Sequence, residues 1–114
     1  MKKYQVGEFE EIVMLTICIL QSQAYGVSIQ KEIEMRLQRE ASMGALHSAL
    51  IRLEEKGFLK SKGGESSEGR EGRPRRYYEV TALGRKALDY IRKNREQLWS
   101  AIPNVAVKAK FTSF

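Results

Sequence analysis

The sequence predicts a single small domain of the α+β class. The chain has 114 residues, enough for one hydrophobic core and too few for two full-sized domains. Three segments with the apolar spacing of helices come first, two segments with the alternation of strands follow, and one more helical segment comes after them. Hydrophobic residues make up 42% of the chain and charged residues 30%, a mixture typical of folded globular proteins.

The first predicted helix covers residues 8–23 and is apolar on nearly every side. One face carries Phe9, Ile12, Val13, Ile17 and Leu20, and the remainder is mostly Met14, Leu15, Cys18 and Ile19. Such a helix is buried on more than one side, which in a domain this small indicates a second subunit. Its apolar run, residues 12–20, is far shorter than the roughly 20 residues of a membrane span. The sequence thus predicts self-association and no membrane anchor.

Two more helices are predicted, at residues 27–38 and 43–56. The first is amphipathic. Ser42 is a suitable N-cap for the second, and Gly57 suits the left-handed position after its end. The side chains expected to face inward from the second are Ala45, Leu46, Ala49, Leu50 and Leu53.

Residues 58–62 and 75–81 are predicted strands, joined by a loop rich in Gly, Ser and Arg. Thr81 can cap a fourth helix at residues 82–102, which Pro103 ends. No structure is predicted for residues 104–114. The division of the chain is therefore 1–81, 82–103 and 104–114.

The fourth helix carries apolar residues at alternating spacings of three and four, interrupted once by Arg95. This spacing is typical of a helix that pairs with another helix. With the apolar first helix, it predicts a dimer interface formed by Phe9, Ile12, Leu88, Ile91, Leu98 and Ile102.

The charge of the chain favours an anionic partner. Its 20 Lys and Arg exceed its 14 Asp and Glu, which gives a net charge of +6, and nucleic acid is the commonest partner of so basic a domain. Cys18 is the only cysteine, so an intramolecular disulfide is excluded, and it is best interpreted as a small buried hydrophobe in a reducing compartment. Acidic residues before the apolar run argue against a signal peptide, so we expect a cytoplasmic protein.

Residue types that support catalysis are scarce. One His and one Cys cannot supply a zinc site or a Cys/His pair with ligand spacing. Gly64 and Gly69 have the spacing of a phosphate-binding loop, but Arg70 and Glu71 stand where Lys and Ser or Thr are required. We therefore expect no enzymatic activity, no metal and no cofactor.

The order of the elements is that of a winged helix-turn-helix, in which the third helix enters the major groove of DNA and the hairpin, or wing, lies alongside. The outward side chains of the third helix are small or hydrogen-bonding near its start, although an ordinary solvated face has the same composition. The DNA contacts predicted from the helices are Tyr25, Lys31, Ser42, Met43, Gly44, His47, Ser48 and Arg52.

The predicted hairpin concentrates basic residues beside flexible glycines. Arginine suits bidentate phosphate contacts and narrow grooves, and a tyrosine hydroxyl can reach the DNA backbone. The DNA contacts predicted from the hairpin are Lys60, Lys62, Arg70, Arg73, Arg75, Arg76 and Tyr77.

Several short motifs resemble those of the PadR-like transcriptional regulators, over about residues 7–100. They are Gly7-Glu8-Phe9-Glu10, Ala24-Tyr25-Gly26-Val27, Ser42-Met43-Gly44-Ala45-Leu46, Arg52-Leu53-Glu54-Glu55-Lys56-Gly57 and Gly72-Arg73-Pro74-Arg75-Arg76-Tyr77-Tyr78, followed by Thr81. The resemblance implies a homodimeric repressor with one C-terminal helix, which packs near the first helix of the partner. His47 stands where the family usually has Tyr, which implies a different operator preference.

The sequence therefore predicts a homodimeric repressor that binds double-stranded DNA at an inverted repeat. The alternative is a winged helix adaptor whose basic wing binds an acidic protein. Two roles are open for Trp99: packing in the dimer interface, or lining a pocket with Met14 for a small aromatic or phenolic ligand, as in some relatives.

Overall fold

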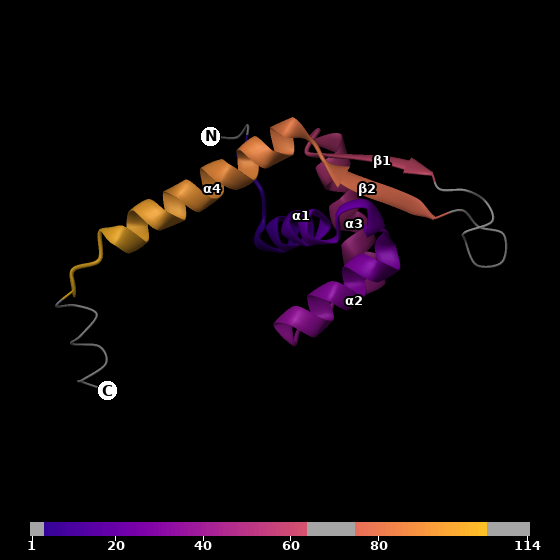
Figure 1. Cartoon of the computed structure of the whole chain (residues 1–114), viewed down its shortest axis with the longest axis horizontal. Coiled ribbons are helices and arrows are strands. Elements are labelled where there is room, and N and C mark those ends of the chain that lie inside the picture. Colours follow the sequence, from indigo (N-terminus) through magenta and orange to yellow (C-terminus); the bar gives the residue numbers. More distant parts are fainter. Residues whose placement is uncertain (1–3, 64–74, 105–114) are drawn as a thin grey trace.

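The computed structural model describes residues 4–63 and 75–104. Its elements, in chain order, are α1 (Glu8–Leu20), the 3-10 helix η2 (Gln21–Gln23), α2 (Gly26–Leu37), α3 (Met43–Glu55), β1 (Leu59–Gly63), β2 (Arg76–Val80) and α4 (Ala82–Ser100). Figure 1 shows α1, α2 and α3 gathered into a body, with the β1–β2 hairpin projecting on one side; α4 begins beside the hairpin and runs past α1 to project on the other side. The α+β class and the winged helix arrangement are confirmed.

The predicted helix boundaries hold best where a side chain caps the helix. Ser42 Oγ accepts a hydrogen bond from the backbone N–H of Ala45 at 3.1 Å, so α3 begins where predicted. At the end of α1 the prediction was wrong. The helix stops at Leu20 rather than residue 23, because Gln21 turns the chain sharply with φ 55° and ψ −124°.

Thr81 fixes the start of α4 against the loop after α3. Its Oγ1 accepts a hydrogen bond from the N–H of Gly84 at 3.0 Å and donates one to the carbonyl of Gly57 at 2.6 Å. Gly57 has φ 82°, the left-handed conformation predicted for it. One hydroxyl therefore connects the end of the α3 region with the first turn of α4.

The two strands pair in antiparallel register, from Leu59 opposite Val80 to Gly63 opposite Arg76. The turn before α2 extends this sheet. Tyr25 forms an isolated bridge with Tyr77, and the N–H of Tyr78 donates to the carbonyl of Ala24 at 2.9 Å. The wing is therefore joined by backbone hydrogen bonds to the start of α2.

The hydrophobic core takes residues from all four α-helices and from the start of β1. Ala45, predicted to face inward, is exposed, because the inward face of α3 begins one residue later at Leu46. The buried hydrophobic residues are Val13, Met14, Ile17, Ala24, Ile29, Ile33, Ala41, Leu46, Ala49, Leu50, Leu53, Phe58, Leu59, Ala87 and Leu88.

This core corrects two predictions, one for a ligand-binding residue and one for a dimer-interface residue. Met14 has no exposed surface, so it does not line a pocket at the surface of α1. Leu88 is only 9% exposed and packs in the same core, so Ile91 is the first of the predicted interface residues of α4 that reaches the surface.

Gly84 lies where α4 meets the body. A Cβ at this position would lie 2.3 Å from the carbonyl oxygen of Phe58 and 2.8 Å from Cγ1 of Val80. Any larger residue would therefore push α4 away from the loop that begins the wing. The first turns of α4 are part of the body for this reason.

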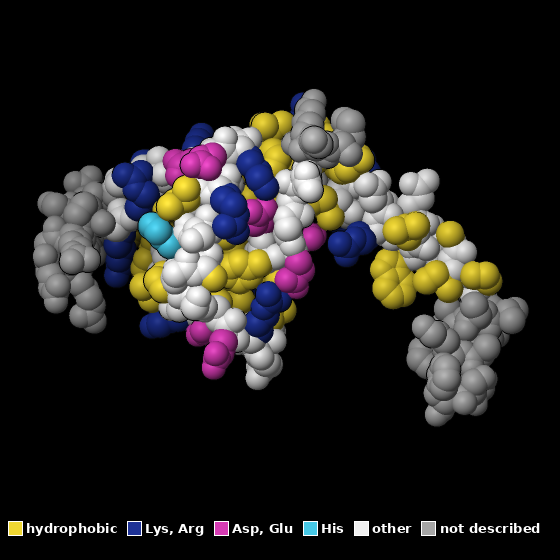
Figure 2. All heavy atoms as spheres, turned by 180° about the vertical axis from the view of Figure 1, so that it is seen from behind, with side chains coloured by type: hydrophobic (Ala, Val, Ile, Leu, Met, Phe, Trp, Pro, Cys, Tyr) yellow, Lys and Arg dark blue, Asp and Glu magenta, His cyan; other side chains and the backbone are white. Residues whose placement is uncertain are grey.

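The far end of α4 leaves the body altogether. The molecule measures 59 × 30 × 21 Å along its principal axes, and Figure 2 shows hydrophobic side chains gathered on the protruding end of the helix. Leu98 is 70% exposed, Trp99 71% and Ile102 40%. Within residues 4–63 and 75–104, no helix combines the length and hydropathy of a membrane span.

Candidate nucleic-acid interface

The N-terminal half of α3 presents an open surface. Met43, His47 and Ser48 are exposed, and a Cβ added to Gly44 would have no atom within 4 Å. The N-terminal amides of a helix favour negative charge. The predicted contact residues from Ser42 to Ser48 therefore lie together on one accessible surface that suits the edge of a DNA groove.

The start of α2 lies beside this surface. Gly26 is in van der Waals range of Met43, since a Cβ on the glycine would lie 3.8 Å from the sulfur. Tyr25 is the N-cap residue of α2, and its N–H donates to Ser28 Oγ at 2.9 Å. Lys31 is exposed farther along α2. The structure thus brings Tyr25 close to the beginning of α3 and leaves Lys31 open to solvent.

The wing divides its described cations between two faces. Arg76 donates to Ser61 Oγ at 2.9 Å, and Ser61 Oγ donates to the Glu54 carboxylate on α3 at 2.8 Å. Lys60 and Lys62 flank Ser61 in β1, so their side chains point to the opposite face. Arg76 therefore lies on the α3 side of the wing, and the two lysines lie on the other. Predicted contacts Arg70 and Arg73 fall outside the described residues.

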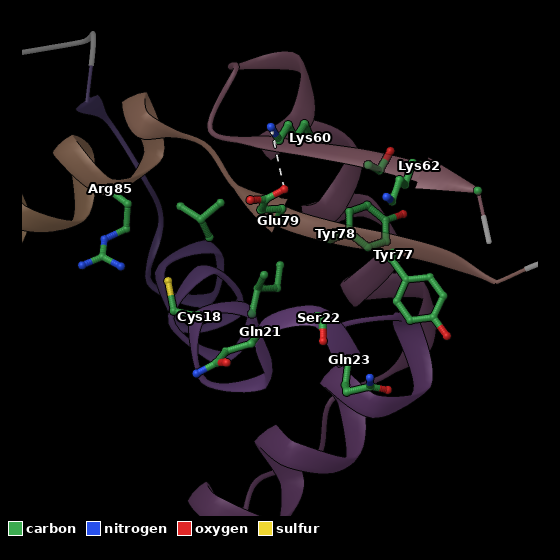
Figure 3. Close-up of a pocket in the computed structure, with 14 residues that line it drawn as sticks. Cys18, Gln21, Ser22, Gln23, Lys60, Lys62, Tyr77, Tyr78, Glu79 and Arg85 are labelled. Atoms are coloured by element: carbon green, nitrogen blue, oxygen red, sulfur yellow. Dashed lines mark ion pairs between the residues drawn. The ribbon is translucent and has the colours of Figure 1, made fainter.

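The lysine face of the wing borders a groove of about 1100 Å³, opposite the end of α1 and η2. Figure 3 shows Lys60, Lys62 and Glu79 on the wing side, Gln21 and its neighbours across the groove, and Arg85 of α4 at one end. Lys60 and Glu79 are 3.7 Å apart and both are exposed. Lys62 and Arg85 add positive charge to the groove.

The hydroxyl of Tyr78, on the α3 side of the wing, has a raised pKa. The Tyr78 ring is half-buried, and burial raises the pKa of its hydroxyl. The negative charge of Glu54 raises this pKa further, against a smaller opposite effect of Arg76. Tyr78 therefore remains a neutral hydrogen-bonding group throughout the physiological range.

Arg75 stacks on the turn that leads into α2. Its guanidinium carbon lies 4.2 Å from the centroid of the Tyr25 ring, and the rings of Tyr25 and Tyr77 meet edge to face at 5.5 Å between centroids. Three of the predicted DNA-binding residues, from two distant parts of the chain, thus form one cluster. Sequence reasoning named all three without indicating that they touch.

Arg52 has a structural partner that the sequence analysis missed. Its Nε donates to Glu10 Oε2 at 2.6 Å, and Lys56 Nζ donates to Glu10 Oε1 at 3.0 Å. The N–H of Gly7 also donates to Glu10 Oε1 at 3.0 Å. A carboxylate three residues after an N-cap is a recognised capping signal, so this last contact was readable from the sequence.

The pKa of Glu10 reflects this cluster. Burial by itself would raise the pKa, but the hydrogen bonds from Arg52, Gly7 and Lys56 outweigh burial and lower the pKa from 4.5 to about 2. The carboxylate is therefore charged at all physiological pH values. It fixes the first turn of α1 to the last turns of α3.

Among the residues that the structure describes, no three His, Cys, Asp or Glu side chains are placed to hold a metal ion. The clustered groups are arginines, tyrosines, amides and hydroxyls, which are suited to bind phosphate and base edges.

Two of the similar solved structures carry PadR names, and a third shares the fold. A PadR-like transcription factor from Bacteroides fragilis is 26% identical, with a TM-score of 0.68 over 81% of this chain and 84% of that chain. A PadR family transcription regulator from Clostridium difficile is 25% identical, with a TM-score of 0.65 over 81% and 92%. A complex structure of hsRosR, at 16% identity and a TM-score of 0.72 over 98% and 90%, shares the fold.

Sequence comparison gives the family directly. No curated protein matches the chain. The profile of the transcriptional regulator PadR-like family, however, matches residues 15–90, well over half of the chain. That segment contains α3, the wing and the Tyr25 turn. The chain therefore belongs to the PadR-like family of DNA-binding transcriptional regulators, which are not enzymes.

Proposed function

We propose that the protein is a homodimeric repressor that acts in the cytoplasm and binds an inverted-repeat operator. In this proposal two copies of α3 enter successive major grooves, with half-sites about one helical turn apart. Ser42 to Ser48 face the DNA, and wing arginines contact the phosphate backbone. The repressor role is the one implied by the family resemblance.

The observation that carries the dimer is the exposed apolar end of α4. Leu98 and Trp99 in α4, and Ile102 just after its last residue, project beyond the body, where they contribute nothing to the core of their own chain. Removing apolar surface from water is favourable by about 25 cal/mol per Å². A second copy that covers this end supplies that burial, and it also brings a second α3 to the same DNA.

Residues of α1 support the same interface. Leu15 and Ile19 are exposed, while the predicted interface residues Phe9 and Ile12 are half-buried against the core. Arg39 lies over the Phe9 ring, with 5.5 Å from its guanidinium carbon to the centroid. We propose that the end of α4 covers Leu15, Ile19 and the accessible edge of Ile12 in the partner.

Sedimentation velocity tests the dimer with two matched double variants. Leu98→Glu with Ile102→Glu places two charges on the apolar face, and Gln97→Glu with Ser100→Glu places the same charges on the opposite face of α4. We expect the first pair to be monomeric with weakened DNA binding and the second pair to remain dimeric. A dimer in both would locate the interface elsewhere.

Footprinting on the DNA upstream of the protein's own gene tests the operator, since local repressors often control their neighbours. We expect protection of two half-sites whose centres are about 10 base pairs apart, on one face of the duplex. Transcription from that promoter should fall when the protein is added. A single protected half-site, or activation of transcription, would contradict the proposed repressor.

Trp99 has two proposed roles within this dimer. It packs against the partner, as exposed aromatic residues at interfaces commonly do, or it forms one wall of a site for a planar aromatic or phenolic ligand. A ligand releases DNA only if it binds the DNA-free arrangement more tightly. The second role therefore requires that ligand binding and operator binding oppose each other.

A further inference from the structure

The turn before α2 and the start of β2 hold each other in place through three contacts. The Arg75 guanidinium carbon lies 4.2 Å above the Tyr25 ring, the Tyr25 and Tyr77 rings meet edge to face, and the Tyr78 N–H donates to the Ala24 carbonyl. Arg75 is the first described residue after the loop of the wing. These contacts act on the residue where the wing returns to the body.

The Tyr25 ring is a rigid platform because its backbone is fixed on both sides. The N–H of Tyr25 donates to Ser28 Oγ at 2.9 Å, and its carbonyl accepts from the N–H of Ile29 at 2.8 Å. Ser28 Oγ in turn donates to the carbonyl of Gln23 at 2.6 Å. A side chain stacked on this ring is therefore held relative to α2 and the adjoining start of α3.

Stacking suits an arginine that is to contact phosphate. The ring attracts the face of the guanidinium, whereas its N–H donors lie in the plane and point from its edge. Stacking thus restricts a long side chain without occupying those donors. A lysine has no planar face to stack and would lose this restriction.

We propose that Tyr25 is a positioning residue that holds the guanidinium of Arg75 in orientation for a DNA phosphate, with Tyr77 bracing the ring. This inference rests on the proposed function, in which Arg75 contacts the DNA backbone. It assigns Tyr25 an indirect role: the ring acts through Arg75, and the Tyr25 hydroxyl is dispensable.

The test uses a mixed-sequence duplex of about 30 base pairs, because a phosphate contact acts on any sequence. Affinity is measured at several salt concentrations for Tyr25→Phe, Tyr25→Leu, Arg75→Ala and the Tyr25→Leu/Arg75→Ala double variant. Tyr25→Phe keeps the ring and should bind within about twofold of the parent protein. Tyr25→Leu removes the ring and should weaken binding about three- to fivefold.

The double variant decides whether the two residues act together. We expect it to bind no more weakly than Arg75→Ala, because the ring has no cation left to hold. Independent, multiplying losses would overturn the inference, and so would a Tyr25→Phe variant as weak as Tyr25→Leu. Arg75→Lys distinguishes loss of orientation from loss of fold, because a lysine has no planar group for the ring to position. We therefore expect the Tyr25→Leu/Arg75→Lys double variant to bind less than twofold more weakly than Arg75→Lys alone.

Failure of the proposed function gives a different result. If Arg75→Ala leaves both the affinity and the salt dependence unchanged, the proposed wing contact itself is wrong and the inference falls with it. If Arg75→Ala weakens binding and Tyr25→Leu does not, the wing contact stands and only the positioning role is overturned. Urea unfolding of each variant checks that the protein remains folded.

Discussion

Arg52 on α3 points back to Glu10 on α1, with 2.6 Å between Nε and Oε2. The two residues are far apart in the chain, and their contact joins the first turn of α1 to the last turn of α3. Lys56 completes the cluster on the other carboxylate oxygen. The position of α3 therefore depends on a charge in the helix proposed to contact the partner.

Glu10→Gln should lower the free energy of unfolding at pH 7 by about 2 kcal/mol. The substitution leaves two cations without their carboxylate, and the cost lies below that of a fully buried pair because Arg52 and Lys56 are partly exposed. Urea unfolding measures the difference. Glu11→Gln is the control, because it removes the same charge one residue farther along α1.

The contribution of Glu10 to the free energy of unfolding should decrease as the pH is lowered. Its pKa is lowered to about 2 in the folded protein, so its contribution is complete above about pH 4.5 and is lost as the pH falls towards 2. The parent protein and Glu10→Gln should therefore converge in stability across that window. A difference that stays constant from pH 7 to pH 2.5 would contradict the charged cluster.

Arg52→Ala should weaken DNA binding without changing its salt dependence. Its guanidinium donates a hydrogen bond to Glu10. We therefore expect the variant to lose DNA affinity because α3 is displaced, and not because a phosphate contact is lost. Each phosphate contact contributes about 1 to the slope of log affinity against log salt concentration. A slope lowered by about 1 in Arg52→Ala would instead support the DNA contact predicted from the sequence.

Gly84→Ala should destabilise the protein by about 1–3 kcal/mol, as overpacking of a close contact does. The new Cβ would meet the carbonyl oxygen of Phe58, which is backbone and cannot rotate away. Gly44→Ala is the matched control, since it adds the same methyl group to α3 in open space. The control should be neutral or stabilising by up to about 1 kcal/mol, because Ala favours helix over Gly.

Trp99 fluorescence distinguishes the two roles of the indole. A panel of planar aromatic cations and phenolics is titrated while fluorescence and operator binding are followed together. Quenching that accompanies DNA release, together with loss of that ligand-driven release in Trp99→Ala, would establish a ligand site. Absence of a response across a chemically broad panel would assign Trp99 to packing of the interface.

Local rules predicted the parts of the fold that local chemistry determines. Ser42 and Thr81 cap their helices, and Gly57 takes the left-handed conformation, because each depends on residues close in the chain. The order of elements followed from the change of apolar period. These features were enough to identify the winged helix arrangement before any tertiary contact was known.

Contacts between distant residues were beyond the reach of the same rules. The apolar pattern of α1 does not say which side faces its own core, so it allows Met14 in a ligand pocket although this side chain has no exposed surface. Alternation in β1 predicts that Lys60 and Ser61 point to opposite faces of the hairpin, but it does not predict that Ser61 is the one facing α3. The Glu10 cluster and the stacking of Arg75 on Tyr25 likewise depend on how distant elements pack.

The close contacts of Gly84 fix the start of α4, so a small change of angle there becomes a large displacement at the other end of the helix. The helix has 19 residues and is therefore about 28 Å long, with its first turns fixed in the body and its far end outside it. A tilt of about 10° at the fixed end displaces the free end by about 5 Å. In the proposed dimer the free ends are tied together, so the same tilt would instead change the separation of the two α3 helices, which must match a half-site spacing of about 34 Å. The preferred operator spacing of Gly84 variants would test this link between the tilt of α4 and the separation of the two α3 helices, and a single glycine at the base of the wing would then set the length of the sequence that the protein recognises.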